Sequence, residues 1–193
     1  MALEVAEELS AAAWLSVAEV GWMRVVTFGP ASFSAYARLR YLPDPVRPGM
    51  RESEVRLPAR WTTEIDMARA ALEALAGYSS STRDCHVCVW EGGAAFRSAA
   101  LTRGAMVDLG HRRYVLFTGT LDDLAGWGDL FDSAVCSAPA FVWPADHAWC
   151  FASDVDPHWA GIGADRGVVD RLVADRNLDV VRADPDEPQP TYY

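Results

Sequence analysis

The spacing of apolar side chains predicts three to four helices. The best marked one follows Thr63, because Thr63 and Asp66 have the spacing of a capping box and Gly77 is placed to end the helix. An apolar stripe at helical spacing also predicts a helix over residues 2–20. The remaining helices are expected over residues 167–175 and, capped by Thr120 and Asp123, through Gly126.

Short runs rich in β-branched and aromatic residues, or with alternating apolar and polar residues, predict strands between these helices. They cover residues 22–28, 85–91, 112–118, 140–144, 147–155, 159–162 and 178–182, while residues 33–42 fit either a helix or a strand. The order mixes strands irregularly with helices and lacks the regular βαβ alternation of a doubly wound fold. We therefore expect a single α+β domain over residues 1–182, with a mainly antiparallel sheet and three to four flanking helices.

Two proline-rich stretches fall outside this pattern. Residues 43–60 carry four prolines and Gly49, so we expect a long irregular loop of the kind that is often functional or mobile. Residues 183–193 carry three more prolines, and we expect a loose tail.

Composition narrows the function classes. The 193 residues include 27 acidic and 17 basic ones, for a net charge of −10, and all the basic residues are Arg. The absence of Lys suggests a GC-rich genome and excludes Schiff-base, pyridoxal-phosphate and P-loop lysine chemistry. No dense basic patch is present, so we expect neither nucleic acid nor an anionic membrane as a partner. The charge suits a basic protein partner or a cation, although it also serves solubility alone.

The ends and cysteines of the chain indicate its compartment. The first eight residues are acidic rather than cationic, and no apolar run approaches the ~20 residues of a membrane span, so we expect a cytoplasmic protein. The four cysteines should then be reduced thiols. Cys85 and Cys88 form a CxxC pair that could supply half of a zinc site, but on a strand they would point to opposite faces, which favours buried thiols.

Catalytic motifs are sparse. There is no GxSxG elbow, and Gly161-Ile162-Gly163 lacks the continuation of a dinucleotide-binding loop. Asp154, Asp156 and His158 are an alternative candidate for a divalent-metal site, with Asp146 and His147 in the same stretch. The alternative interpretation of this segment is a turn at Asp156–Pro157.

Tryptophan is unusually frequent, and four tryptophans lie in or beside predicted strands with acidic residues close by. Trp is favoured both in cores and at binding hot spots, so these side chains either pack the interior or form a binding face. The candidate binding residues are Trp90, Glu91, Trp143, Asp146, Trp149, Asp154, Asp156 and Trp159.

Four segments together carry a family resemblance: AYARLRYLP (35–43), CHVCVWEGG (85–93), HRRYVLFTGTLDDL (111–124) and APAFVWPADHAWCFASDVDPHWAGIGA (138–164). The chain resembles a family of uncharacterised actinobacterial proteins with AYAR, CxxxxWEG and WPxDxAWCxA…DxD motifs. It departs from that pattern at His86, Val142 and His147, and the resemblance implies no known activity. The WxxDxxW pattern with its trailing acids is also loosely similar to bacterial toxin-immunity proteins.

The sequence therefore predicts a binding or interaction module, immunity-like in the loose sense above, that uses an acidic, tryptophan-bearing face and needs no cofactor. Two alternatives stay open. One is a metal-dependent enzyme using the Asp/His cluster, and the other is a small-ligand binder with a tryptophan-lined pocket.

Overall fold

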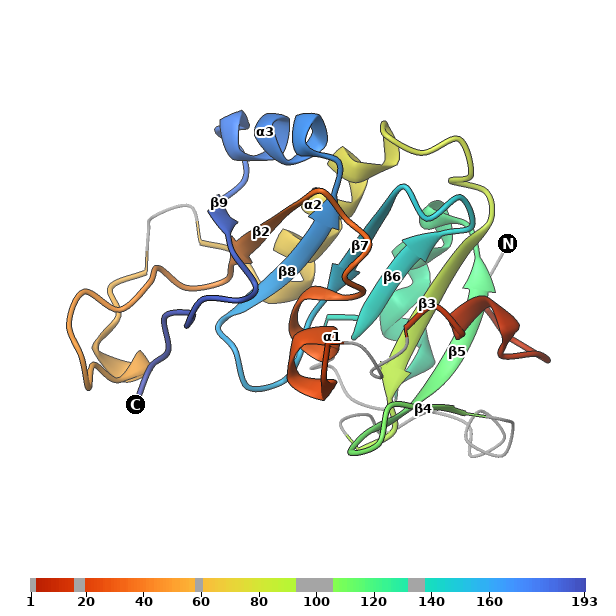
Figure 1. Ribbon diagram of the computed structural model, residues 1–193, viewed down its shortest axis with the longest axis horizontal. Coiled ribbons are helices and arrows are strands. Elements are labelled where there is room, and N and C mark those ends of the chain that lie inside the picture. The colour runs from red at the N-terminus through yellow and green to blue at the C-terminus, as the bar shows by residue number, and fades with distance from the viewer. Residues whose placement is uncertain (1–2, 16–19, 58–60, 93–105, 132–137) are drawn as a thin grey trace.

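An antiparallel sheet organises the computed structural model, which describes residues 3–15, 20–57, 61–92, 106–131 and 138–193 (Figure 1). Nine strands lie within these residues, in the order β1-β5-β3-β6-β7-β8-β2-β9, with β4 paired to β5, and every ladder is antiparallel. The strands are β1 (Glu4–Val5), β2 (Ala35–Arg40), β3 (Cys85–Trp90), β4 (Val107–Asp108), β5 (Arg113–Gly119), β6 (Phe141–Pro144), β7 (Trp149–Ala152), β8 (Trp159–Ala164) and β9 (Val180–Ala183). The predicted α+β class is confirmed.

Helices cover both faces of this sheet. The described ones are α1 (Trp22–Phe28), α2 (Glu64–Ala76), α3 (Arg166–Ala174) and the 3-10 helices η1 (Ser10–Ala12), η2 (Glu52–Glu54) and η4 (Leu121–Leu130). In Figure 1, α1 lies in front of the sheet and α2 behind it. The larger core cluster joins the sheet to α2, η4 and α3, and the second cluster joins its other face to α1 and the N-terminal segment.

The alternation of β3 explains how one strand serves both cores. Val87 and Val89 belong to the cluster under α2, whereas Cys88 belongs to the cluster under α1. Successive side chains of a strand point to opposite faces, so a continuous apolar run is what a central strand covered on both sides requires.

Residues 22–28, predicted as a strand, form helix α1, so that prediction was wrong. Gly21 and Gly29 bracket the helix with φ values of 80° and 76°, a region that favours glycine. The helix packs against β8 at Gly161, where an added Cβ would lie 2.0 Å from the Thr27 carbonyl oxygen. Tertiary packing thus overrides the strand preference of the β-branched residues. The close approach of the α1 backbone to β8 also explains why glycine stands at position 161 of the Gly-Ile-Gly sequence without a role in nucleotide binding.

The prediction of one helix over residues 2–20 was also wrong for the described part. Glu4 and Val5 pair with Thr118 and Phe117 as the edge strand β1, and only Ser10–Ala12 form a helical turn. Half of the predicted apolar stripe consists of alanines, which bury little area. Pairing with β5 therefore decides the conformation of this segment. Residues 1–2 and 16–19 lie outside the described residues.

The capped helices agree with the prediction. The Thr63 hydroxyl accepts a hydrogen bond from the Asp66 amide at the start of α2, and the helix ends before Gly77. Thr120 and Asp123 form a reciprocal capping box, but η4 continues beyond the predicted end at Gly126 to Leu130. These helices were predictable because their start signals are local in sequence.

The two proline-rich stretches lie against each other. The loop from Pro43 contains only the short helix η2 as regular structure in its described part, up to Leu57. Tyr192 donates a hydrogen bond to the Pro43 carbonyl oxygen, and the Tyr193 amide donates to the Met50 carbonyl oxygen at 2.9 Å. The stretch expected to be a loose tail is thus attached to the loop, and the two run beside each other in Figure 1.

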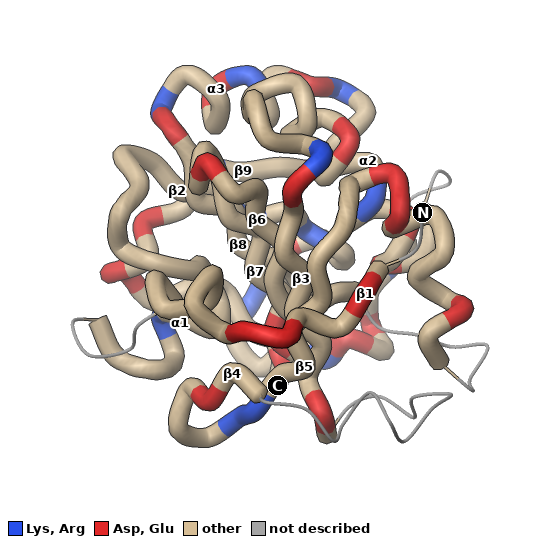
Figure 2. The backbone as a smooth tube through the Cα atoms, turned by 90° about the vertical axis from the view of Figure 1, so that its right-hand side faces the viewer, with Lys and Arg blue, Asp and Glu red and all other residues tan. Residues whose placement is uncertain are grey.

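Acidic positions are scattered along the chain trace. Figure 2 shows Asp and Glu on every side of that view, with Arg residues among them. Many of the carboxylates are bound to Arg, as Asp44, Glu91, Asp154 and Asp179 are. The net charge of −10 therefore forms no single acidic face along the described trace.

Candidate functional site

The four tryptophans singled out in the sequence lie in different environments. Trp143 and Trp149 are fully buried on opposite faces of the sheet, and Trp159 is 3% exposed in a third, smaller cluster. Trp90 is partly buried at the end of β3. These side chains pack the interior and do not form one exposed face.

Asp154 and Asp156 bind an arginine instead of converging on an open site. Arg112 pairs with Asp154, and its Nη2 lies 3.2 Å from Asp156 Oδ2. The guanidinium also lies over two rings, 4.7 Å from the Trp90 centroid and 5.6 Å from that of Trp22. This arrangement joins α1, β3 and the β4–β5 hairpin to the loop after β7.

Asp154 is the deepest member of this arrangement, with a side chain only 2% exposed. Burial raises the pKa of Asp154, and the Val155 backbone amide and the Arg112 charge oppose that effect only in part. One carboxylate oxygen, Oδ2, has no hydrogen-bond partner among the described residues. The arginine network therefore links several elements of the fold, but the desolvation cost of the buried Asp154 carboxylate is only partly offset.

The third residue of the predicted metal set, His158, faces another partner. Its Nε2 lies 3.2 Å from Asp44 Oδ1, rather than near Asp154 or Asp156 in a shared cluster. Within the described residues, no group of three His, Cys, Asp or Glu side chains is arranged to hold a metal ion. The donors of the metal hypothesis therefore do not converge.

Glu91 and Asp146 have local structural partners. Arg113 donates to both oxygens of Glu91, at 2.6 and 2.9 Å. Asp146 accepts hydrogen bonds from the Ser79 hydroxyl at 3.0 Å and the Ser80 amide at 2.8 Å. Each carboxylate ties one turn to a neighbouring strand or loop.

His147, between β6 and β7, has a φ of 54°, the one positive value outside glycine in the described residues. Its ring stacks on Trp14 with centroids 3.9 Å apart, and Trp14 in turn contacts Trp143. Burial lowers the pKa of His147 and of nearby His86. Both imidazoles are packed against aromatic rings.

The cysteines are buried thiols where the structure describes them. Cys85 and Cys88 are both inaccessible on strand β3, and Cys150 is buried on β7. Burial raises the pKa of Cys85 to about 12 and raises the pKa of Cys88 and Cys150 as well. A raised thiol pKa disfavours the thiolate that metal binding and nucleophilic attack require. Cys136 lies outside the described residues.

A groove of about 600 Å³ lies between the end of β2, helix α2 and the turn before β9. Its apolar lining comprises Leu39, Tyr41, Pro43, Trp61, Met67, Ala70 and Leu178. Arg40, Asp66, Arg176 and Asp179 contribute charged groups. A mainly apolar surface with a few charged groups is the general form of a binding site.

Trp61 is the exposed tryptophan of this groove. It is 39% exposed, and its indole N–H donates to the Tyr41 carbonyl oxygen at 3.1 Å. The hydrogen bond fixes one edge of the ring while leaving apolar surface accessible. This combination of a fixed position and an exposed face is typical of an interaction hot spot.

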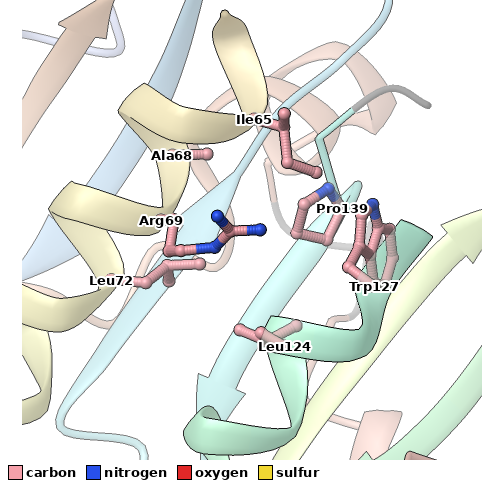
Figure 3. A pocket seen from close by; sticks show the side chains of 7 residues that line it. All are labelled: Ile65, Ala68, Arg69, Leu72, Leu124, Trp127 and Pro139. Atoms are coloured by element: carbon pink, nitrogen blue, oxygen red, sulfur yellow. The ribbon is translucent and has the colours of Figure 1, made fainter. Parts of the chain in front are cut away.

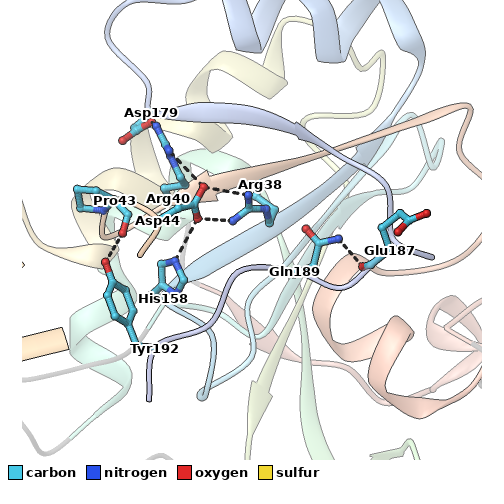
Figure 4. A network of polar contacts seen from close by, with 9 residues as sticks. All are labelled: Arg38, Arg40, Pro43, Asp44, His158, Asp179, Glu187, Gln189 and Tyr192. Atoms are coloured by element: carbon cyan, nitrogen blue, oxygen red, sulfur yellow. Dashed lines mark hydrogen bonds and ion pairs between the residues drawn. The ribbon is translucent and has the colours of Figure 1, made fainter. Parts of the chain in front are cut away.

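A polar network stands at the β2 end of the groove (Figure 4). Arg38 donates to both oxygens of Asp44, at 2.6 and 3.1 Å, and His158 contacts the same carboxylate. Arg40 lies between Asp44 and Asp179, at 3.3 and 2.6 Å. Partial burial alone would raise the pKa of Asp44, but the hydrogen bonds and charges of Arg38, His158 and Arg40 lower it to about 2.

A second pocket lies between α2 and η4, lined by Ile65, Ala68, Arg69, Leu72, Leu124, Trp127 and Pro139 (Figure 3). It holds only about 10 Å³, close to the space of one water-sized sphere. It is a packing defect between two helices and not a ligand site.

Sequence reasoning missed the residues of the groove. Trp61 follows the proline-rich loop and lies outside the predicted strands, so it is not among the tryptophans associated with strands. One signal was present, since Trp61 lies two residues before the predicted helix cap Thr63, between the proline-rich loop and the helix. Tyr192 carried no local signal, because its partner Pro43 is 149 positions away, and the contact of His158 with Asp44 spans 114 positions.

No family model, curated protein or solved structure matches the chain. None of the described helices combines the length and the hydropathy that crossing a membrane requires.

Proposed function

We propose that this protein is a binding module that takes a cationic, partly apolar segment of a protein partner into the groove beside Trp61. The observation that carries the proposal is Trp61 itself. It is the single tryptophan among the described residues that combines more than a third of its surface exposed with a position in a groove. Trp supplies large contact area at low conformational cost, which makes it a common anchor of interfaces.

Glu64, which lies in sequence between the groove residues Thr62 and Asp66, is a candidate contact for a cationic partner. Burial raises the pKa of Glu64, next to the groove on α2, and the negative charge of Glu52 raises it further. Neither carboxylate has an ion-pair partner among the described residues. An incoming Arg or Lys would relieve this repulsion, and the net charge of −10 would speed the encounter.

The groove would therefore act through recognition and not catalysis. Asp66 and Asp179 on its walls are held by Thr63 and Arg40. These carboxylates are held in fixed positions from which they would orient a ligand. Neutralising a toxin-like partner, as the loose similarity to immunity proteins suggests, would be one form of this binding.

A selection from a random displayed peptide library tests the proposal. Enriched peptides should pair Arg or Lys with an apolar residue, and replacing their basic residues with Glu should abolish binding. In calorimetry, Trp61→Ala should weaken the binding of an enriched peptide about tenfold or more, as expected for a hot spot. Affinity should also fall as salt rises, because the charges are partly exposed.

Met23→Ala is the matched control, because Met23 is a 57% exposed apolar residue on α1, across the sheet from the groove. It should leave the affinity unchanged. Enrichment of acidic peptides, the absence of any enrichment, or equal binding by Trp61→Ala and the wild type would each contradict the proposed function.

A further inference from the structure

The C-terminal segment reaches the back of the groove wall. Tyr192 contacts this region in two ways: its hydroxyl donates to the Pro43 carbonyl oxygen, and its ring lies edge-on to His158, with centroids 4.6 Å apart. Pro43 also lines the groove, so Tyr192 contacts a residue of the groove wall. Figure 4 shows Tyr192, Pro43 and His158 together at the edge of the polar network.

His158 connects Tyr192 to Tyr41, a second residue of the groove wall. Its carbonyl oxygen accepts hydrogen bonds from the amides of Tyr41 and Leu42, at 3.0 and 3.2 Å. Tyr41 is 3% exposed, and its carbonyl oxygen holds the indole of Trp61. The contacts of Tyr192 thus converge on residues 41–43, the part of the chain that positions Trp61.

The segment is anchored on both sides of Tyr192. Before it, the Gln189 side-chain amide donates to the carbonyl oxygens of Asp184 and Glu187, at 2.7 and 2.8 Å, and Asp186 pairs with Arg24 of α1. After it, the Tyr193 amide bonds Met50. Residues 189–193 therefore form a strap, attached to the proline-rich loop at its start, Pro43, and further along it at Met50.

We infer that Tyr192 is a positioning residue of the groove, and that the strap of residues 189–193 sets the binding-competent arrangement of Tyr41, Pro43 and Trp61. This inference rests on the proposed function and adds a control element to it. A site held in its bound arrangement avoids an ordering cost when the ligand binds. Release of the strap would restore that cost and weaken binding without unfolding the sheet.

Three variants of the full chain separate the contacts. Tyr192→Ala removes both the hydroxyl and the ring, whereas Tyr192→Phe keeps the ring on His158 and loses only the bond to Pro43. Tyr193→Ala is the matched control, because its side chain is 90% exposed and its backbone amide remains.

Two readouts need no ligand. Hydrogen exchange of the Trp61 indole N–H, followed by NMR, should be about fivefold faster in Tyr192→Ala, intermediate in Tyr192→Phe and unchanged in Tyr193→Ala, because exchange reports local opening. Tryptic cleavage after Arg51, next to the Met50 anchor, should accelerate in the same order, while cleavage after Arg171 of α3 stays constant.

The third readout is the affinity of an enriched cationic peptide, which should fall about fivefold in Tyr192→Ala at an unchanged melting temperature. Unchanged indole exchange in Tyr192→Ala, or faster exchange with unaltered peptide affinity, would overturn the inference. If the wild type binds no peptide, the proposed function fails on its own, since indole exchange and cleavage still measure the strap.

Discussion

The segment Trp143–Gly163 with its partner Arg112, and the groove beside Trp61 with the Asp44 network, carry the same kinds of side chains and use them differently. Both regions contain aromatic rings, aspartates, arginine partners and histidine. In the first, Trp143 and Trp149 are fully buried, and Arg112 is enclosed by Trp22, Trp90 and two aspartates. In the second, Trp61 is 39% exposed in an open groove, and the side chain of Asp44 retains 23% exposure.

The difference shows that solvent access, and not residue type, separates a stabilising cluster from a candidate binding site. A tryptophan on a central strand is covered by the layer above it, whatever its charged neighbours. A tryptophan between a proline-rich loop and a helix cap has no such layer and keeps a free face. The comparison can be tested by removing the corresponding side chains from both regions.

The largest expected effect is that of Trp149→Ala. Truncation of this fully buried ring should lower the free energy of unfolding by about 4 kcal/mol, through lost burial and the cavity left behind. Trp61→Ala should cost about 1 kcal/mol or less, since the ring is partly exposed and makes one hydrogen bond. Urea unfolding of both variants measures the contrast, and equal losses would show that the two tryptophans have the same structural role.

The next effect concerns the two arginine networks. Arg112→Met should lower the free energy of unfolding by about 3 kcal/mol at pH 7, because it leaves the Asp154 carboxylate buried without a cation. Arg40→Met should cost about 1 kcal/mol or less, since Arg40 is partly exposed and its partners can turn to water.

The pH dependence of the stability of Arg112→Met tests whether the buried Asp154 charge causes the loss. Removing Arg112 raises the pKa of Asp154 further above its ordinary value, so the variant loses stability as pH rises through that pKa. Below about pH 4 the carboxyl is protonated in the folded and unfolded states alike, and the loss should shrink. Adding Asp154→Asn to Arg112→Met should restore much of the stability at pH 7. A loss that is constant with pH would instead indicate packing of the guanidinium between the rings.

Parts of the molecule with local signals were predictable from the sequence. The capping residues Thr63 and Thr120 mark the helices that follow them, and the apolar run at 85–90 marks a central strand. The strand–helix order also led to the antiparallel α+β class, because it lacks the crossover helices that a parallel sheet needs.

The remaining features depend on contacts between distant segments. Helix α1 can pack against β8 because Gly161 has no side chain there, and no local sequence pattern in residues 22–28 predicts this contact. The groove needs residues from β2, α2 and the turn before β9, and Tyr192 meets Pro43 across a separation of 149 positions. Local patterns record the preference of a segment but not which segments will cover it.

The smallest expected effect compares one carboxylate from each region as pH changes. The pKa of Asp44 is lowered to about 2, so its contribution to stability is present above about pH 4 and is lost as pH falls from there towards 2. Since Asp44 is partly exposed, solvent screening reduces the contribution to about 1 kcal/mol. Urea unfolding at several pH values should therefore show the wild type losing its advantage over Asp44→Asn across that acidic range.

Asp154 should behave in the opposite sense. Its pKa is raised by burial, so the wild type should lose stability relative to Asp154→Asn as pH rises through the raised pKa, not as pH falls. Two aspartates bound to arginine would then give pH profiles of opposite sign, because the side chain of Asp44 is 23% exposed and that of Asp154 only 2%. Profiles of the same sign would mean that arginine pairing outweighs burial at Asp154, and the two aspartates would then resemble each other in their electrostatics as well as in their arginine partners.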